Sequence, residues 1–182
     1  MYQHIYVPVD NSDYSNRAID LGVELGRAFG ARLTGCHVYA ARLHDYRFKQ
    51  MEYTLPDEYK DENELERQRK IHDSLIAMGL QLISDSYLDV MGKKADEAGL
   101  AFERKMMDGK HYKALIDDAR ASDYDLVVMG ALGMGAVKDS HLGSVTERFV
   151  RRVTTDTLVV RNHDPLKDQQ GAIVVGLDGS PQ

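Results

Sequence analysis

The sequence has one cysteine, Cys36, no tryptophan and only four prolines among its 182 residues. A single cysteine excludes an internal disulfide and a cysteine-based metal site, and its position in an apolar segment predicts a buried, inert thiol. Positive charge is also scarce, because 23 Lys and Arg stand against 29 Asp and Glu, for a formal net charge of −6. A general affinity for nucleic acid is therefore not expected, since phosphate backbones are bound by clustered Lys and Arg.

Long apolar runs are missing as well. No stretch reaches the roughly 18 apolar residues that span a bilayer, and the N-terminal MYQHIYVPVD lacks the pattern of a secretory signal, so we expect a cytoplasmic protein without a membrane segment. His44 and His72 have no neighbours at metal-ligand spacing, and no metal site made of protein ligands alone is predicted. The content of 43% hydrophobic and 29% charged residues is that of an ordinary soluble domain.

The most informative segment is VVMGALGMGAVKDSHLGSVTERFV, residues 127–150, where an apolar strand leads into a glycine-rich loop and then a helix. Gly130, Gly133 and Gly143, followed by Ser144, form the pattern G-x2-G-x9-G-S. Glycines let backbone amides approach an anion, and a helix start directs unpaired N–H groups toward it. The segment therefore predicts phosphate binding. Ser144 is expected to donate its hydroxyl to the ligand or to cap the helix, with Glu147 completing a capping box.

Apolar and amphipathic segments alternate along the chain. Strands are predicted at 5–9, 33–38, 100–107, 126–129 and 157–161, and helices at 15–29, 65–98, 110–121 and 144–153, with a break of the second helix near 84–86. Strands separated by helices pair in parallel through right-handed crossovers, which predicts an α/β protein with a three-layer α/β/α sandwich. Asp10 and Gly130 follow the first and fourth strands, whose carboxyl ends commonly flank the ligand crevice of such sheets.

The glycine pattern, preceded by LVVM and followed by VTERFVRR, resembles the nucleotide-binding signature of the ATP-binding subgroup of the universal stress protein (UspA-like) family. The start, IYVPVDNSDYSNRAIDLGVELGRAFGARLTGCHVY, is similar to that family's first strand, first helix and second strand, and the likeness covers almost all of the chain. The family usually reads VDGS where this chain has Asn11, a mild departure because Asn tolerates a left-handed backbone. The resemblance implies a Rossmann-like sheet of the adenine nucleotide alpha hydrolase type, with five parallel strands in the order 3-2-1-4-5.

The resemblance also implies a site for ATP, or for ADP or AMP. Asp10 would bind the ribose or the adenine side, and Val38 would offer backbone atoms to the base. Met129 and Gly130 would support the ribose and first phosphate, and the residues after them would present amides and hydroxyls to the β and γ phosphates. Mg²⁺ would be held chiefly by phosphate oxygens and water. The implied nucleotide-binding residues are Pro8, Val9, Asp10, Val38, Met129, Gly130, Gly133, Gly143, Ser144, Val145 and Thr146.

The function implied by the resemblance is a regulatory module of the stress response that senses ATP and changes its partner contacts. No catalytic residue is assigned, and at most weak hydrolysis or autophosphorylation at Ser140 or Ser144 is expected, because His141 and Asp139 are the only local candidates for a base. A nucleotide-free dimerising scaffold stays open as an alternative.

Two enzyme-like alternatives fit less well. A phosphoacceptor receiver domain would use an aspartate after its third strand, where Asp108 stands, but the acidic pair after the first strand and the lysine after the fifth are missing. An ATP pyrophosphatase would need an SGGxDS-like loop, and VDNSDYS lacks its glycines.

Residues 1–162 are predicted to form the domain, with a charged, tyrosine-rich insertion at about 41–66 that exceeds what the family usually has there. The insertion is expected to be a solvated helix or loop, with a lid or a docking surface as alternatives. Residues 163–171 would be a linker. The segment AIVVGLDGSPQ, 172–182, repeats the opening pattern with Asp178 and Ser180, which predicts the first strand of a second, tandem domain. The alternative is a lone strand that adds to a sheet edge.

The edge of the last strand, with Leu158, Val159 and Val160, joins two domains in proteins that this chain resembles. The resemblance therefore implies a homodimer or pairing with a second tandem domain. Thr155 to Thr157 stand where many members have a proline, so the pairing edge could differ in detail.

Overall fold

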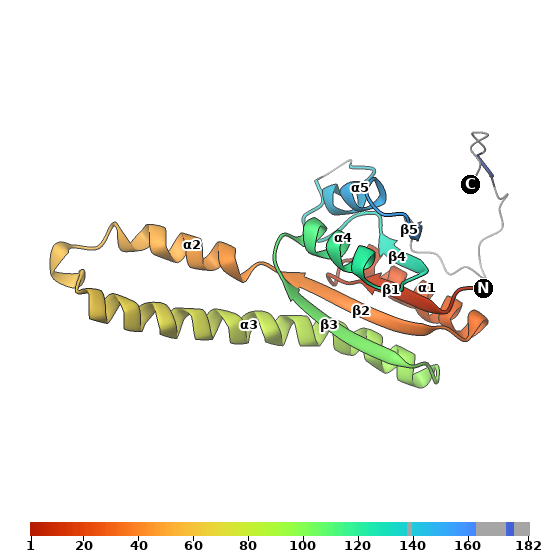
Figure 1. The fold of residues 1–182 in the computed structure, drawn as a ribbon, viewed down its shortest axis with the longest axis horizontal. Coiled ribbons are helices and arrows are strands. Elements are labelled where there is room, and N and C mark those ends of the chain that lie inside the picture. Colours follow the sequence, from red (N-terminus) through yellow and green to blue (C-terminus); the bar gives the residue numbers. More distant parts are fainter. Residues whose placement is uncertain (138–139, 163–173, 177–182) are drawn as a thin grey trace.

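A five-stranded sheet forms the centre of the computed structural model, which describes residues 1–137, 140–162 and 174–176. The strands lie in the order β3-β2-β1-β4-β5, and every neighbouring pair is parallel (Figure 1). Both the parallel pairing and the order implied by the resemblance are confirmed. The strands are β1 (His4–Pro8), β2 (Arg32–Tyr39), β3 (Phe102–Asp108), β4 (Leu126–Gly130) and β5 (Asp156–Val160).

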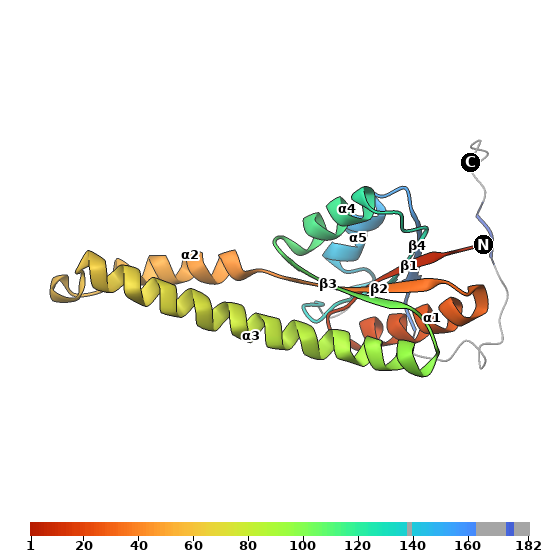
Figure 2. The same ribbon diagram turned by 60° about the horizontal axis from the view of Figure 1, so that its bottom comes forward.

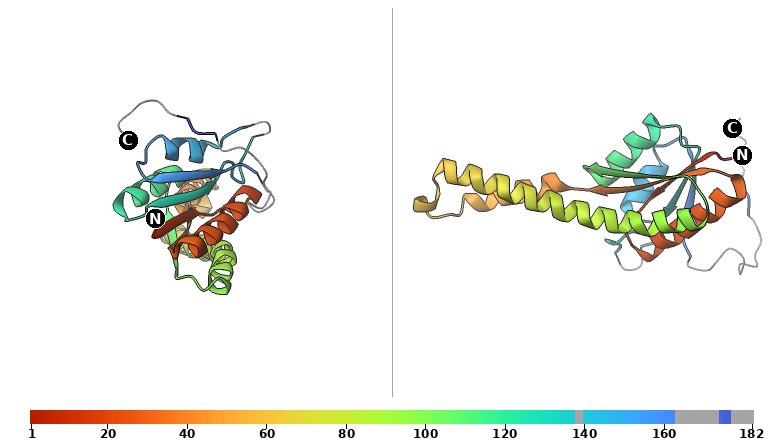
Figure 3. Two further views of the ribbon diagram at one scale, coloured as in Figure 1. Left: turned by 90° about the vertical axis from the view of Figure 1, so that its right-hand side faces the viewer. Right: turned by 90° about the horizontal axis from the view of Figure 1, so that it is seen from below.

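Helices cover both faces of the sheet, so the predicted three-layer sandwich is confirmed (Figure 3). Helices α1 (Asp13–Phe29) and α3 (Glu62–Glu97) pack on one face, where Ile19 and Leu88 are fully buried in the core. Helices α4 (His111–Ala121) and α5 (Ser144–Val150) pack on the other face, where Phe149 is fully buried. Cys36 lies in this second core as a buried free thiol, as predicted.

Local sequence explains where α1 begins and ends. The Ser12 hydroxyl accepts a hydrogen bond from the Ser15 amide at 3.2 Å, so the helix begins at Asp13, two residues before the predicted start. Asn11, which replaces the glycine usual in the family, has a left-handed φ of 61° just before this cap. Gly30 ends the helix with a φ of 68°. The first helix is thus set directly beside the end of β1.

A helical hairpin projects from the sandwich, as Figures 1 and 2 show from two directions. It consists of α2 (Ala41–Glu52), a short 3-10 turn (Asp57–Tyr59) and the first half of α3, which is 36 residues long and is capped by Asp61. The insertion predicted at 41–66 is therefore mostly helical. The aromatic rings of Phe48 and His72 stack at 4.0 Å, and Arg69 forms a two-pronged ion pair with Glu52 at 2.7 and 2.8 Å. Hydrogen bonds to this glutamate raise the pKa of the Arg69 guanidinium.

The predicted break of the second long helix near residues 84–86 is wrong, because α3 is continuous there. Ser84 donates its hydroxyl to the Leu80 carbonyl at 2.8 Å, and Ser86 donates to the Ile83 carbonyl at 2.7 Å. Serine hydroxyls that bond to the preceding turn are accommodated within a helix. Neither serine therefore interrupts the helix.

Other predicted boundaries differ by one to three residues. Strand β3 begins at Phe102, α5 ends at Val150 and β5 begins at Asp156. The predicted strand of a second domain and its linker lie outside the described residues, apart from Val174 to Gly176, which form no regular element. Within the described ranges, none of the helices combines the length and apolar character needed to cross a membrane.

Candidate functional site

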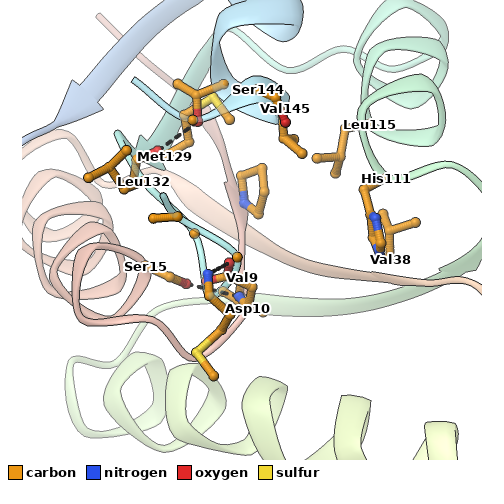
Figure 4. A pocket seen from close by; sticks show the side chains of 18 of the residues that line it. Val9, Asp10, Ser15, Val38, His111, Leu115, Met129, Leu132, Ser144 and Val145 are labelled. Atoms are coloured by element: carbon orange, nitrogen blue, oxygen red, sulfur yellow. Dashed lines mark hydrogen bonds between the residues drawn. The ribbon is translucent and has the colours of Figure 1, made fainter. Parts of the chain in front are cut away.

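The carboxyl ends of β1, β2 and β4 open into a cavity of ≈ 680 Å³. Its volume lies within the roughly 300–1,000 Å³ of typical small-molecule sites. In the sheet, β2 lies on one side of β1 and β4 lies on the other. The cavity therefore lies at the point where the strand order reverses, which is where sheets of this type bind ligands. Figure 4 shows side chains from both sides of this point converging on the cavity.

All the residues assigned to nucleotide binding from the sequence line this one cavity. They come from segments that are far apart in the chain: Pro8, Val9 and Asp10 at the end of β1, Val38 in β2, Met129 and Gly130 in β4, Gly133 in the loop, and Gly143, Ser144, Val145 and Thr146 at the start of α5. The structure thus brings the whole predicted set together. Their contact with a nucleotide stays a prediction.

Asp10 ties the end of β1 to the glycine-rich loop. One carboxylate oxygen accepts hydrogen bonds from the Ser12 amide at 3.0 Å and the Ser12 hydroxyl at 2.6 Å. The other oxygen accepts from the amide of Met134, 124 residues away, at 3.0 Å. Hydrogen bonds to an ionised carboxylate are stronger than neutral ones. Asp10 therefore positions the loop, whether or not it also touches a ligand.

Each of the three motif glycines lies where another group approaches closely. A Cβ at Gly133 would lie 2.4 Å from the second Asp10 carboxylate oxygen, and one at Gly130 would lie 2.9 Å from the Tyr14 backbone carbon at the first turn of α1. A Cβ at Gly143 would lie 3.2 Å from the Ala131 carbonyl oxygen. The G-x2-G-x9-G spacing is thus explained by how tightly the loop, α1 and β4 pack around the cavity.

Helix α5 begins at Ser144, as predicted, but its N-cap differs from the prediction. Gly143 is its N-cap, with its amide donating to the Ala131 carbonyl at 2.7 Å and its carbonyl accepting from the Glu147 amide at 2.9 Å. Ser144 is the first helical residue, and the Glu147 carboxylate pairs with Arg151 at 3.1 Å. The predicted capping box of Ser144 and Glu147 is therefore wrong, because Gly143 is the N-cap and the Glu147 carboxylate pairs with Arg151.

This geometry changes what two predicted residues offer a ligand. The Gly143 amide is already used by Ala131. Thr146 is buried and donates its hydroxyl to the Gly130 carbonyl at 2.8 Å, which fixes α5 on the end of β4. Ser144, whose side chain is labelled in Figure 4, lines the cavity together with the loop.

The other end of the cavity is apolar. Val38, Leu115, Met129 and Val145 line it, and Val38 and Leu115 lie beside His111 in Figure 4. An apolar wall opposite a glycine-rich loop suits a ligand with a flat ring at one end and anionic groups at the other.

Several lining residues were missed from the sequence. His111 begins α4 just after β3, and the rule that ligands bind at the carboxyl ends of strands would have found it. Ile83 and Tyr87 come from the middle of α3, and only the packing of that helix brings them to the cavity. No local motif marks either residue.

His37 also lines the cavity and faces α3. Its Nδ1 lies 2.8 Å from the Ser84 hydroxyl. Burial lowers the pKa of His37, the neighbouring His111 lowers it further, and Asp10 opposes the shift. The imidazole is therefore neutral near pH 7 and stays so to a lower pH than an exposed histidine.

Candidates for catalysis are only partly placed. Ser140 lines the cavity, His141 is exposed and is not among its lining residues, and Asp139 lies outside the described residues. Among the residues described, no three His, Cys, Asp or Glu side chains are grouped as metal ligands would be.

The receiver-domain alternative is wrong. In receiver-type sheets the third strand lies next to the first, in the order 2-1-3-4-5. Here β3 is an edge strand, and the Asp108 carboxylate accepts a hydrogen bond from the Ala41 amide at 2.9 Å.

The family model described as "Universal stress protein family" matches residues 1–161. The chain belongs to the universal stress protein family. Universal stress protein YxiE of Bacillus subtilis is 25% identical over 161 residues, which are 88% of this chain and 100% of that protein. The structure of UspA from Lactobacillus plantarum aligns with a TM-score of 0.64 at 21% identity, covering 88% of this chain and 98% of that one.

Two structures of similar fold contain adenine nucleotides. A universal stress protein in complex with cAMP aligns with a TM-score of 0.57 at 24% identity, covering 88% of this chain and 97% of the other. A universal stress protein family protein from Arabidopsis thaliana, with AMP bound, aligns with a TM-score of 0.56 at 13% identity, covering 87% of this chain and 91% of the other.

Proposed function

We propose that this universal stress protein domain binds an adenine nucleotide, ATP in the first place, in the cavity at the ends of β1, β2 and β4. The observation that carries the proposal is the convergence of every motif residue on one cavity of ≈ 680 Å³ with an apolar end and a glycine-rich end. The nucleotides bound to two proteins of the same fold support the choice of adenine.

The proposed orientation follows from the chemistry of the two ends. The adenine lies against Val38 and Leu115, which offer an apolar surface, and the ribose lies near Asp10 and Met129. The phosphates lie along the loop from Gly133 and over the exposed Ser144 at the first turn of α5. The dipole of a helix start favours an anion at that place.

Magnesium would arrive with the phosphates. The Asp10 carboxylate already accepts three hydrogen bonds, and Glu147 pairs with Arg151. The ion keeps several water ligands and binds phosphate oxygens readily. Phosphate oxygens and water therefore supply its ligands in this proposal.

We propose a regulatory role rather than efficient catalysis. Ile83 and Tyr87 connect the cavity to α3, the helix that extends into the projecting hairpin. A nucleotide that contacts these side chains favours one position of α3, and the hairpin carries that change to a partner. Slow hydrolysis stays compatible with the site, and Ser140 is the lining residue where autophosphorylation would be sought.

The proposal is tested by purifying the protein without added nucleotide, denaturing it and identifying what is released by chromatography and mass spectrometry. The matched pair is Gly133→Ala, whose Cβ would meet Asp10, and Gly79→Ala, whose Cβ would meet nothing within 4 Å and which does not line the cavity. We expect ATP or ADP near one per chain from the wild type and from Gly79→Ala, and far less from Gly133→Ala. A protein that is empty and ignores added ATP in calorimetry would be a nucleotide-free scaffold.

Pairing through β5 is a second proposal, supported by its position at the edge of the sheet with Leu158 38% exposed. An open edge strand can add a strand from a second copy or from a tandem domain. Light scattering after gel filtration, compared between the wild type and Leu158→Glu, tests this edge. An unchanged mass would remove β5 from consideration.

A further inference from the structure

The projecting half of α3 carries four large apolar side chains that face solvent. Ile71, Leu75, Met78 and Leu82 are 49%, 62%, 63% and 72% exposed. Their spacing of four, three and four residues is the spacing of a coiled-coil seam. At about 100° per residue, the four side chains fall within roughly 60° of the helix circumference. We call these four residues the α3 stripe.

Helix α2 does not cover the α3 stripe. The side of α3 that contacts α2 carries Leu65, Arg69 and His72, which are buried or half-buried. By the same helical geometry the stripe lies roughly 120° around the axis from that side. Figures 2 and 3 show the outer side of the projecting α3 with no other helix against it.

We propose that the α3 stripe is the seam of an antiparallel homodimer, in which α3 of a second copy packs against it. A twofold axis between Leu75 and Met78 would place Leu75 of one copy against Met78 of the other, and Ile71 against Leu82. Each large side chain of the stripe thereby meets an apolar partner. This interface is separate from the β5 edge and does not depend on the nucleotide proposal.

The charges beside the stripe favour the antiparallel direction. Arg67 and Asp85 are 18 residues apart, which is five helical turns, so they lie on the same flank of the stripe. The antiparallel arrangement brings Arg67 of each copy to Asp85 of the other, whereas a parallel one would place this flank of the two helices on opposite sides of the seam, so that the two charges would not meet. Arg67 is free to do so, because it is 72% exposed and its contact with Glu64 is long, at 3.6 Å.

A glycine beside the stripe leaves room for a second helix. Gly79 lies in the middle of α3, and a Cβ there would meet nothing within 4 Å. Glycine is unfavourable inside a helix, so its presence is not explained by helix stability. A small residue beside an apolar seam lets two helix backbones come close.

The first test is the oligomeric state of the full chain, measured by light scattering and sedimentation from about 5 to 500 μM. The variant Leu75→Glu with Leu82→Glu places charges in the stripe. The matched control Ala77→Glu with Gln81→Glu adds the same charges at exposed positions of the same helix, outside the stripe. Circular dichroism verifies that each variant is folded.

We expect the stripe variant to halve the mass of the wild-type assembly, and the control and Leu158→Glu to leave the α3 dimer intact. A wild type that is monomeric at 500 μM would overturn the proposal. So would an assembly that survives the stripe substitutions and is lost only with Leu158→Glu, because β5 alone would then hold the copies together.

The second test determines whether the two α3 helices of the dimer run antiparallel. Ile71→Cys and Leu82→Cys are prepared as two separate variants. Each is oxidised mildly alone, and the two are also oxidised as an equal mixture. The native Cys36 is buried, so it does not compete for cross-linking. The antiparallel seam predicts a disulfide-linked dimer in the mixture that joins the peptides containing residues 71 and 82. Efficient cross-linking of either variant with itself, and not in the mixed pairing, would overturn the antiparallel arrangement.

Discussion

Replacing Gly133 by alanine tests the part of the site that joins β1 to the glycine-rich loop. The added Cβ would lie 2.4 Å from a carboxylate oxygen of Asp10 and 3.6 Å from its carboxyl carbon. Atoms cannot approach that closely, so the carboxylate must rotate away. The oxygen that moves is the one that accepts the hydrogen bond of the Met134 amide.

The expected magnitude follows from that one hydrogen bond. A hydrogen bond to a charged group contributes about 1.5–3 kcal/mol, and the loop loses it when the carboxylate moves. If the loop must hold its position to bind phosphates, the affinity for ATP falls by roughly 10- to 100-fold, since every 1.4 kcal/mol corresponds to about tenfold. Gly79→Ala adds the same methyl group outside the cavity, where it meets nothing within 4 Å, and should change the affinity less than about twofold.

The assay is a double-mutant cycle with Asp10→Ala, read by calorimetric titration of ATP and by urea unfolding. If Gly133→Ala acts by displacing the carboxylate, it should cost little in the Asp10→Ala background, where the carboxylate is gone. The coupling energy should then be close to the whole effect of Gly133→Ala. Equal costs of Gly133→Ala in both backgrounds would refute the reasoning.

Three further predictions concern the surroundings of the cavity. Gly130→Ala should lower the free energy of unfolding by about 1–3 kcal/mol in urea titrations, because its Cβ would lie 2.9 Å from the Tyr14 backbone carbon; an unchanged midpoint would show that α1 shifts freely. Thr146→Val should cost about 1–3 kcal/mol, since the Gly130 carbonyl loses its hydrogen-bond donor, and Thr146→Ser should restore most of that loss. The lowered pKa of His37 means that the unfolded chain binds the proton more tightly, so stability should be full above pH 6.5 and should fall as the pH is lowered through the folded pKa. His37→Gln should flatten the pH dependence of the free energy of unfolding between pH 8 and 5. An unchanged slope would contradict the assignment of this pH dependence to His37.

The parts of the fold that follow local rules were predictable from the sequence. Apolar segments separated by amphipathic helices indicated the parallel sheet, and the G-x2-G-x9-G-S pattern located the cavity. Asp10 was found because it ends the first strand, where such sheets bind ligands. Its hydrogen bond to Met134 was not predictable, since it depends on how a loop 124 residues away folds back.

The errors have identifiable physical causes. The serines at 84 and 86 suggested a break, but each hydroxyl bonds to a carbonyl of the preceding helical turn. The capping box failed because Gly143, whose amide donates to the Ala131 carbonyl, is the N-cap in place of Ser144. In both cases a hydrogen bond to a backbone carbonyl, which the sequence pattern did not reveal, decided the local structure.

The most direct test of the central claim is photolabelling of the wild-type protein with 8-azido-ATP, followed by mass-spectrometric mapping of the labelled peptide. The proposed orientation predicts a label on segments that surround the apolar end of the cavity, near Val38 or Leu115, and its loss with excess ATP and in Gly133→Ala. Labelling confined to the α2 and α3 hairpin, or labelling that excess ATP does not suppress, would contradict a nucleotide site in this cavity.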